Sequence, residues 1–239
     1  MENTKKIKLF IGLSYLLIIC VFLYFFFSKF SLSEITSYDF LRDNQSYFFE
    51  LKKSNLFLIS IIFLALTILW VFPFLGFGSP VALLGGFIFG NWLGTIIVVT
   101  GLSIGATCLY IFANYFLKNI VEEKFSNRFI NLTDKFKKNE FIFFLIYRFV
   151  GGIPFFISNI LPTLFNIKKR NFFFGTIIGM SPQLFVGVSL GAGLSKVLEE
   201  NKEPPTIFKL ISTPDIYLPI FGIIILVFLA IYLRKYFLK

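Results

Sequence analysis

Long apolar runs constrain the fold of this chain more than any other feature. A helix needs about 18–20 apolar residues to cross the hydrocarbon core of a bilayer. The runs that approach or exceed this length are Leu9–Phe27, Leu56–Phe72, Trp92–Leu117, Phe172–Leu198 and Ile216–Leu233. We therefore expect an all-α integral membrane protein, folded as a multi-pass helical bundle.

Composition supports a membrane environment and removes several classes of chemistry. Only 15% of the 239 residues are charged, against about 25% in an average soluble domain. The sequence has no histidine, so it cannot form a Ser-His-Asp triad or an imidazole-ligated metal site. Its two cysteines are too few for an all-cysteine zinc site. We expect no catalytic residues, no bound metal and no cofactor.

The first apolar run follows Lys5, Lys6 and Lys8, so it has to be compared with a cleaved signal peptide. A signal peptide has an apolar core of about 7–15 residues that ends at small side chains. Leu9–Phe27 is longer and ends in three phenylalanines. We expect residues 1–55 to form a retained membrane anchor and a polar loop, residues 56–198 the core, and residues 199–239 a loop and a C-terminal transmembrane helix.

Most of the 23 Lys and Arg residues, which give the chain its net charge of +10, fall into four clusters. These clusters are residues 5–8, residues 118–140, Lys168-Lys169-Arg170 and residues 234–239. Short loops rich in Lys and Arg stay on the cytoplasmic side. With all four clusters there, residues 141–165 must enter and leave the membrane from one side, and residues 56–90 must return to their own side. Basic loops fix the orientation of the chain in the membrane and contact anionic lipid headgroups. Because this accounts for the positive charge, we expect no nucleic-acid partner.

Two further apolar stretches, Pro73–Gly90 and Phe141–Phe165, are interrupted by Pro and Gly. Non-helical backbone at membrane depth is tolerated only inside protein or beside a water-filled cavity. Broken segments at corresponding places in two halves of a chain indicate an inverted repeat with a site between the halves. We expect two opposed re-entrant hairpins, in repeats of about 56–117 and 141–198.

Glycines recur at a spacing of four, which places them on one face of a helix and lets backbones approach closely. The sets are Gly86, Gly90 and Gly94; Gly101 and Gly105; Gly175 and Gly179; Gly187 and Gly191. They serve either helix packing alone or a smooth path along which a lipid tail or a hairpin slides. We include Gly85, Gly86 and Gly90 among the candidate substrate-binding residues.

Residues 118–140 have the periodicity of an amphipathic helix, with Val121, Phe125, Phe129, Leu132 and Phe136 on one face. Such a helix lies on the lipid headgroups or packs as a linker on the bundle. Both alternatives remain open.

Arg148 is an ionisable residue inside the apolar stretch Phe141–Phe165. Such residues are expensive in a membrane and are usually functional, and Arg binds phosphate through two N–H groups. The functional interpretation is an anchor for a lipid phosphate. The alternatives are an interfacial Arg that extends to water, or one that caps the carbonyl groups of a hairpin. Ser158, Asn159 and Gln183 are candidates to complete a wet cavity around it.

The sequence resembles the VTT-domain family, also called SNARE-associated Golgi proteins, which includes the bacterial DedA-type proteins. The most specific motif is Pro80-x-x-Leu83-x-Gly85-Gly86-x-x-Phe89-Gly90-x-x-x-Gly94. Supporting matches are Gly105-Ala106-Thr107 with Tyr110 and Phe112, Tyr147-Arg148 with Pro154 and Asn159, and Gly179-x-x-Pro182 with Gly187 and Gly191. The resemblance covers about residues 56–198.

The resemblance implies two opposed re-entrant hairpins and the movement of lipids between leaflets. It implies that Arg148 holds the phosphate of a phospholipid or polyprenyl phosphate, and that Pro154 and Asn159 shape the hairpin. Relatives often carry Arg at the position of Asn114 and Gly at that of Asn166, and some carry an acid in the first hairpin. Residues 70–94 contain no Asp or Glu, so passive exchange is expected rather than proton coupling.

Three functions remain in competition. We expect a lipid transporter or scramblase in a bacterial plasma membrane, not an enzyme, and we leave a homo-oligomer open. A membrane enzyme acting on lipids is weakened by the lack of histidine and of clustered intramembrane acids. A structural or assembly protein without transport activity would not need Arg148.

Overall fold

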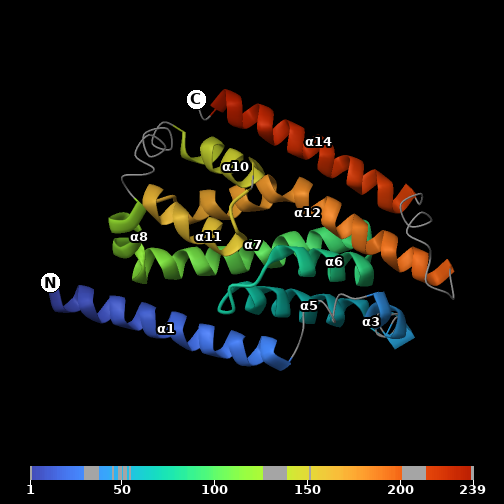
Figure 1. The fold of residues 1–239 in the computed structure, drawn as a ribbon, viewed down its shortest axis with the longest axis horizontal. Helices are drawn as coiled ribbons and strands as arrows, with labels where there is room; N and C mark the ends of the chain where they lie inside the picture. The colour runs from blue at the N-terminus through green and yellow to red at the C-terminus, as the bar shows by residue number, and fades with distance from the viewer. Residues whose placement is uncertain are drawn as a thin grey trace.

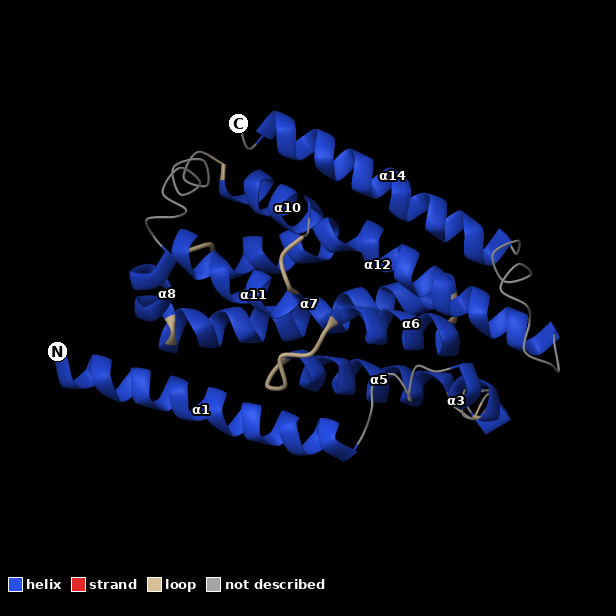
Figure 2. Cartoon of the chain, in the orientation of Figure 1, coloured by secondary structure: helices blue, strands red, loops and turns tan. Residues whose placement is uncertain are grey.

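The computed structural model describes residues 2–29, 38–44, 46–47, 50, 53, 55–125, 139–150, 152–200 and 214–237. These residues form helices joined by short turns, without a strand in the part of the chain that is described (Figure 2). The expectation of an all-α chain is therefore confirmed for these residues.

The helices of the N-terminal half are α1 (Glu2–Lys29), α3 (Tyr38–Asp43), α5 (Leu56–Val71), α6 (Gly78–Phe89), α7 (Asn91–Phe116) and α8 (Lys118–Phe125). Those of the C-terminal half are α10 (Glu140–Val150), α11 (Phe155–Ile160), the short 3-10 helix η2 (Leu161–Phe165), α12 (Lys169–Glu200) and α14 (Pro214–Phe237).

The first broken segment, Pro73–Gly90, forms the turn and the second arm, α6, of a helical hairpin whose first arm is α5. The side chain of Asn55 caps α5 by accepting a hydrogen bond from the N–H of Leu58 at 3.0 Å. The helix ends at Phe72 because the next residue is Pro73, which disfavours helical backbone at the residue before it. At the end of α6, Gly90 has a φ of 78°, a conformation that glycine adopts readily, and the chain turns into α7.

The second broken segment forms a matching hairpin from α10, a turn and α11 with η2. Gly152 in the turn has a φ of 79°, and Pro154 is the N-cap residue of α11. Asn166 adopts a left-handed backbone with a φ of 49° and ends η2. Both stretches that the sequence marks as irregular are thus largely helical, and the Pro and Gly residues lie at their turns and ends.

The two hairpins point in opposite directions along the bundle and meet near its middle (Figure 1). In each half, the first arm packs on the long helix of its own half: α5 on α7, and α10 on α12. The second arm packs on the long helix of the other half: α6 on α12, and α11 on α7. This exchange joins the two halves into one core, with α7 and α12 in contact at its centre.

Glycines make the closest of these crossings possible. A Cβ atom on Gly86 in α6 would overlap the carbonyl oxygen of Val188 in α12, and one on Gly191 in α12 would overlap the carbonyl oxygen of Leu83 in α6. Backbones approach this closely only where the side chain is a hydrogen atom. The packing interpretation of the glycine spacing is therefore confirmed at the α6–α12 crossing.

The described parts of the basic segments gather at one end of the bundle, where the N-terminal end of α1, α8 and the C-terminal end of α14 lie toward the left of Figure 1. The Nζ of Lys118 in α8 lies 3.3 Å from the Oδ1 of Asn166, just before α12 begins. Gly12 in α1 lies against Leu117, at the end of α7. The expected amphipathic helix is described only as α8, because residues 126–138 lie outside the described residues.

Within the described residues, two helices have both the length and the apolar composition needed to cross a membrane, namely Asn91–Phe116 and Lys169–Leu198. The apolar stretches found in α1, α5, α6, α11 with η2, and α14 are shorter. Of the five expected spans, two thus meet both criteria, while α1 and α14 run as continuous helices over Leu9–Phe27 and Ile216–Leu233. The stretch that begins at Leu56 ends after 16 helical residues, at the turn that starts the hairpin.

Candidate functional site

Arg148 lies in the last turn of α10 and is only 4% exposed. Its Nε donates to the Oγ1 of Thr176 at 3.1 Å, its Nη1 to the Oγ of Ser158 at 2.9 Å, and its Nη2 to the Oδ1 of Asn159 at 2.7 Å. The guanidinium therefore joins α10 to α11 and α12. Among the described residues its hydrogen bonds go to side chains and not to backbone carbonyl groups, and the residue is buried, which differs from both structural alternatives.

The two hydroxyl partners are oriented to accept from Arg148. The Ser158 hydroxyl donates its own hydrogen to the carbonyl oxygen of Phe155 at 2.7 Å. The Thr176 hydroxyl donates to the carbonyl oxygen of Phe172 at 2.7 Å. Since each hydroxyl has a single hydrogen, the oxygen atoms present lone pairs to the guanidinium.

Two aromatic rings lie beside the guanidinium. Its central carbon lies 4.8 Å from the ring centroid of Phe172 and 5.2 Å from that of Phe144. Phe172 also stacks on Tyr110 of α7, with centroids 4.3 Å apart, and the Tyr110 hydroxyl donates to the carbonyl oxygen of Ile167 at 2.6 Å. Ring faces attract a cation through their quadrupole, so these contacts favour the charged guanidinium.

Arg148 forms no ion pair with a carboxylate in the described part of the chain. Glu140, the preceding acid on α10, is engaged elsewhere: its Oε1 accepts from the backbone N–H of Lys168 at 2.7 Å and from the Nδ2 of Asn171 at 2.8 Å. This carboxylate therefore caps the start of α12. The partners of Arg148 are neutral, and its positive charge is not balanced by a described residue.

A cavity of about 390 Å³ lies beside Arg148, between the turn of the first hairpin, the second hairpin and α12. Polar side chains from three segments line it: Ser79, Tyr147, Arg148, Ser158 and Gln183. The Gln183 amide donates to the carbonyl oxygen of Phe149. The cavity thus combines one buried cation, several hydrogen-bonding groups and apolar walls, which is the composition of a small-molecule site.

Among the candidate residues, Arg148 and Gln183 line this cavity. Asn159 is fully buried and holds Arg148 from behind the lining. Its Nδ2 atom is buried without a hydrogen-bond partner. Pro154 does not line the cavity and begins α11. The sequence-based interpretation of Arg148 and its neighbours therefore identified residues that the fold brings together.

Gly85, Gly86 and Gly90 do not line the cavity, which differs from their prediction as substrate-binding residues. A Cβ atom on Gly85 would overlap the Val98 side chain, and Gly86 faces the α12 backbone. Gly90 has open space around it but a positive φ. Packing and turn geometry account for all three.

Sequence reasoning missed Thr176, Phe144 and Phe172. Phe144 precedes Arg148 by four residues, so helical spacing alone placed its ring beside the guanidinium. Phe172 and Thr176 also share a helix face at this spacing, but they follow Arg148 by 24 and 28 residues in α12. No local pattern links them to α10. Among the described residues, no group of three or more His, Cys, Asp or Glu side chains is arranged to hold a metal ion.

Residues 72–193 match the VTT domain, and this segment holds both hairpin turns together with the hydrogen-bond and ring partners described for the Arg148 guanidinium. The match covers half of the chain, so the chain belongs to the VTT-domain family. The resemblance seen in the sequence motifs is confirmed.

Relatives come from bacteria and eukaryotes. The chain is 29% identical over 126 residues to the uncharacterized protein YqeD of Bacillus subtilis (strain 168), a match covering 52% of this chain and 60% of that protein. It is 25% identical over 118 residues to a transmembrane protein 41 homolog of Caenorhabditis elegans, covering 48% of each chain. A transmembrane protein 41 homolog of Dictyostelium discoideum is 25% identical over 130 residues, covering 53% of this chain and 38% of the relative.

The chain spans about half the length of the curated relatives it matches. Two of these relatives are transmembrane proteins by name. No solved structure matches the chain.

Proposed function

We propose that this chain is a multi-pass membrane protein that moves a lipid, or a lipid-linked phosphate, between leaflets in the manner of a scramblase. The observation that carries the proposal is Arg148, a buried cation without a described acidic partner, lining a cavity where two opposed hairpins meet. Membership of a family with transmembrane relatives supports it.

A phosphate group is the ligand that suits this cation. A buried charge is costly unless it is paired, and Arg binds phosphate oxygens through N–H groups on separate nitrogens. Arg has five N–H groups, and the three hydrogen bonds to Thr176, Ser158 and Asn159 use one on each nitrogen. A second N–H remains on both Nη1 and Nη2. A phosphate would supply the missing negative charge while the neutral partners keep the guanidinium in place.

The proposed mechanism is passive exchange. The hairpins are re-entrant, so each turn brings a polar cavity wall to the middle of the membrane, and the headgroup rests at Arg148 while the hydrocarbon chains stay in lipid. Residues 70–94 contain no Asp or Glu, so no carboxylate of the first hairpin carries a proton across. We propose that the protein transports lipid and does not catalyse a reaction. We place it in a bacterial plasma membrane as part of this proposal.

In the proposed topology, the basic end of the bundle faces the cytoplasm, and its clustering of Lys and Arg supports this orientation. Lys169 is exposed at the start of α12, and Glu50 is exposed in the sequence before α5, which begins at the end of the bundle away from α8 (Figure 1). In a protein with Cys20 and Cys108 replaced by Ser, a membrane-impermeant thiol reagent applied outside cells should label Glu50→Cys and spare Lys169→Cys. The reverse pattern contradicts this topology.

Transport is tested in vesicles that contain a fluorescent phospholipid or a labelled polyprenyl phosphate. The wild-type protein should accelerate the loss of inner-leaflet label to a bleaching reagent that cannot cross the bilayer, and Arg148→Gln should slow the exchange by at least about tenfold, equivalent to about 1.4 kcal/mol. Arg170→Gln is the matched control, because Arg170 is exposed at the start of α12. No acceleration by the wild type, or undiminished exchange by Arg148→Gln, would overturn the proposal.

The second candidate is a structural or assembly role without transport. It is favoured by the hydrogen bonds of Arg148, which join α10 to α11 and α12 and so stabilise the second hairpin. This candidate predicts that the wild type does not exchange lipids and that Arg148→Gln lowers only the thermal stability. The vesicle assay and a thermal unfolding curve on the same samples separate the two functions.

A further inference from the structure

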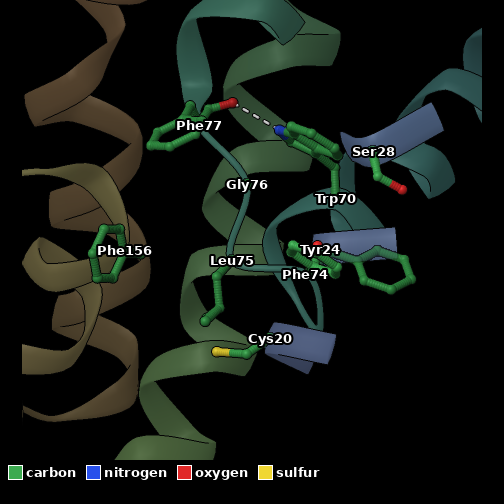
Figure 3. A pocket seen from close by; sticks show the side chains of 9 residues that line it. All are labelled: Cys20, Tyr24, Ser28, Trp70, Phe74, Leu75, Gly76, Phe77 and Phe156. Atoms are coloured by element: carbon green, nitrogen blue, oxygen red, sulfur yellow. Dashed lines mark hydrogen bonds between the residues drawn. The ribbon is translucent and has the colours of Figure 1, made fainter. Parts of the chain in front are cut away.

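A second cavity, of about 660 Å³, lies between α1, the segment around the first hairpin turn and α11 (Figure 3). Its walls include Cys20 and Tyr24 of α1, Trp70, Leu75 and Phe77 of the hairpin, and Phe156 of α11. The Trp70 indole N–H donates to the carbonyl oxygen of Phe77 at 2.9 Å, as Figure 3 shows. With that donor engaged, the Trp70 ring contributes carbon surface to an apolar pocket.

The helix α1 forms one wall of this pocket and is held there by specific contacts. The Tyr15 hydroxyl donates to the carbonyl oxygen of Pro73 in the hairpin turn at 2.8 Å. The Tyr15 ring lies 4.3 Å from that of Phe112 in α7, between centroids. Because non-helical backbone in lipid must find its partners in protein, α1 completes the turn at residues 72–77. This helix lies outside the segment that matches the VTT domain.

The apolar pocket adjoins the Arg148 cavity. Phe77 lines both of them. The neighbouring residues Phe155 and Phe156, at the start of α11, line the Arg148 cavity and the apolar pocket respectively. These phenylalanines lie between the two cavities, of which the Arg148 cavity is polar and cationic and the other is apolar. Together they match the two parts of an amphiphile that has a phosphate at one end and a hydrocarbon chain at the other.

We propose that the apolar pocket holds a hydrocarbon chain of the same lipid whose phosphate binds at Arg148, with Phe77 between the two parts. The proposal rests on the phosphate site of the proposed function and adds the chain site. The pocket lies within the range of about 300–1,000 Å³ that is typical of small-ligand sites. It follows that α1 is part of the binding site and that a block in the pocket should hinder the lipid without touching Arg148.

Cys20 gives direct access to the pocket. It lines the wall and is one of two cysteines, both unpaired. In Cys108→Ser, a pyrene maleimide on Cys20 fills the pocket, whereas a methylthio group leaves most of it open. The matched control is Ile18→Cys in a protein with Cys20 and Cys108 replaced by Ser, because Ile18 is 64% exposed and does not line the pocket.

The probe is a phosphatidic acid with a photoreactive diazirine on one acyl chain, in vesicles of phosphatidylcholine. We expect crosslinks to concentrate on the pocket walls, to fall at least about tenfold with pyrene on Cys20, and to persist with pyrene at position 18 or a methylthio group on Cys20. Crosslinks spread evenly over the exposed faces of α1 and α14, or unaffected by pyrene on Cys20, would overturn the proposal.

Two further measurements distinguish failure of this proposal from failure of the proposed function. Arg148→Gln should lower pocket crosslinks from the phosphatidic acid but not from a diazirine alkanol that has no phosphate. If Arg148→Gln leaves the phosphatidic acid crosslinks unchanged, a lipid shared between the two cavities is excluded. If the crosslinks behave as expected but the wild type does not accelerate lipid exchange, the shared binding site stands and the transport function fails.

Discussion

The Nη2 of Arg148 lies 2.7 Å from the Oδ1 of Asn159, and this hydrogen bond links the two arms of the second hairpin. The acceptor is a neutral amide oxygen, so the contact fixes the guanidinium without cancelling its charge. An Asp at the same position would keep the acceptor and its shape but would add a full negative charge. Asn159 thus positions Arg148 without neutralising it, and an Asn159→Asp variant tests whether the charge of Arg148 is needed.

Asn159→Asp should preserve the fold and abolish the proposed activity. The new carboxylate would form an ion pair with Arg148, and a phosphate would then meet a neutral pair instead of a cation. We expect lipid exchange in vesicles to fall by at least about tenfold, with a thermal unfolding midpoint at or above that of the wild type. Asn119→Asp, at an exposed position of α8, adds the same charge elsewhere and serves as the control. Wild-type exchange by Asn159→Asp would mean that the Arg148 charge is not used.

Glu140→Gln should leave lipid exchange unchanged. The Oε1 of Glu140 accepts hydrogen bonds from the Lys168 N–H and from Asn171 at the start of α12, and a Gln oxygen in the same place can accept both. The loss is the interaction of a negative charge with the helix N-terminus, about 0.3–1 kcal/mol. A small drop in the unfolding midpoint, measured beside the exchange rate, is the expected result. Loss of exchange in a folded variant would show that Glu140 acts at the site.

Gly86→Ala should destabilise the protein by about 1–3 kcal/mol or more, the usual range for overpacking. The new methyl group would overlap the backbone of Val188, which cannot rotate away as a side chain does. Gly78→Ala is the control in the same helix, because its nearest neighbour is the Leu102 side chain at 3.4 Å, an ordinary contact. Thermal unfolding in detergent compares the two. Equal midpoints would contradict the close α6–α12 crossing.

Tyr110→Phe should cost about 1–3 kcal/mol of stability, since it leaves the carbonyl group of Ile167 without its donor in a buried site. The aromatic ring remains, so the stack on Phe172 is retained. We expect a lower unfolding midpoint and normal lipid exchange at a temperature where the variant is folded. Tyr24→Phe removes a hydroxyl from a ring that is 73% exposed and should leave the midpoint unchanged.

Much of the fold was predictable because its signals are local. Apolar runs identify helices, and the Pro and Gly residues at 73, 90, 152 and 154 mark where helices end or turn. A charged residue in an apolar stretch is visible without a structure, so Arg148 was identified as the candidate. The spacing of the α6 glycines indicated close helix packing, which the structure has. Gly85 and Gly86 were also predicted to bind substrate, but they do not line the Arg148 cavity.

The helical class, the two broken segments and the charged residue within an apolar stretch are all visible in the sequence, since each follows from the solvation of a short stretch of chain. The burial of Arg148 and the residues around it depend on the packing of distant helices. Thr176 and Phe172 reach Arg148 from α12, Glu140 is drawn away to the start of the same helix, and α1 docks on the first turn through Tyr15. Hydrogen-bond partners and cavity walls depend on which helices cross and at what distance, and that is set by the packing of the whole bundle rather than by any one segment.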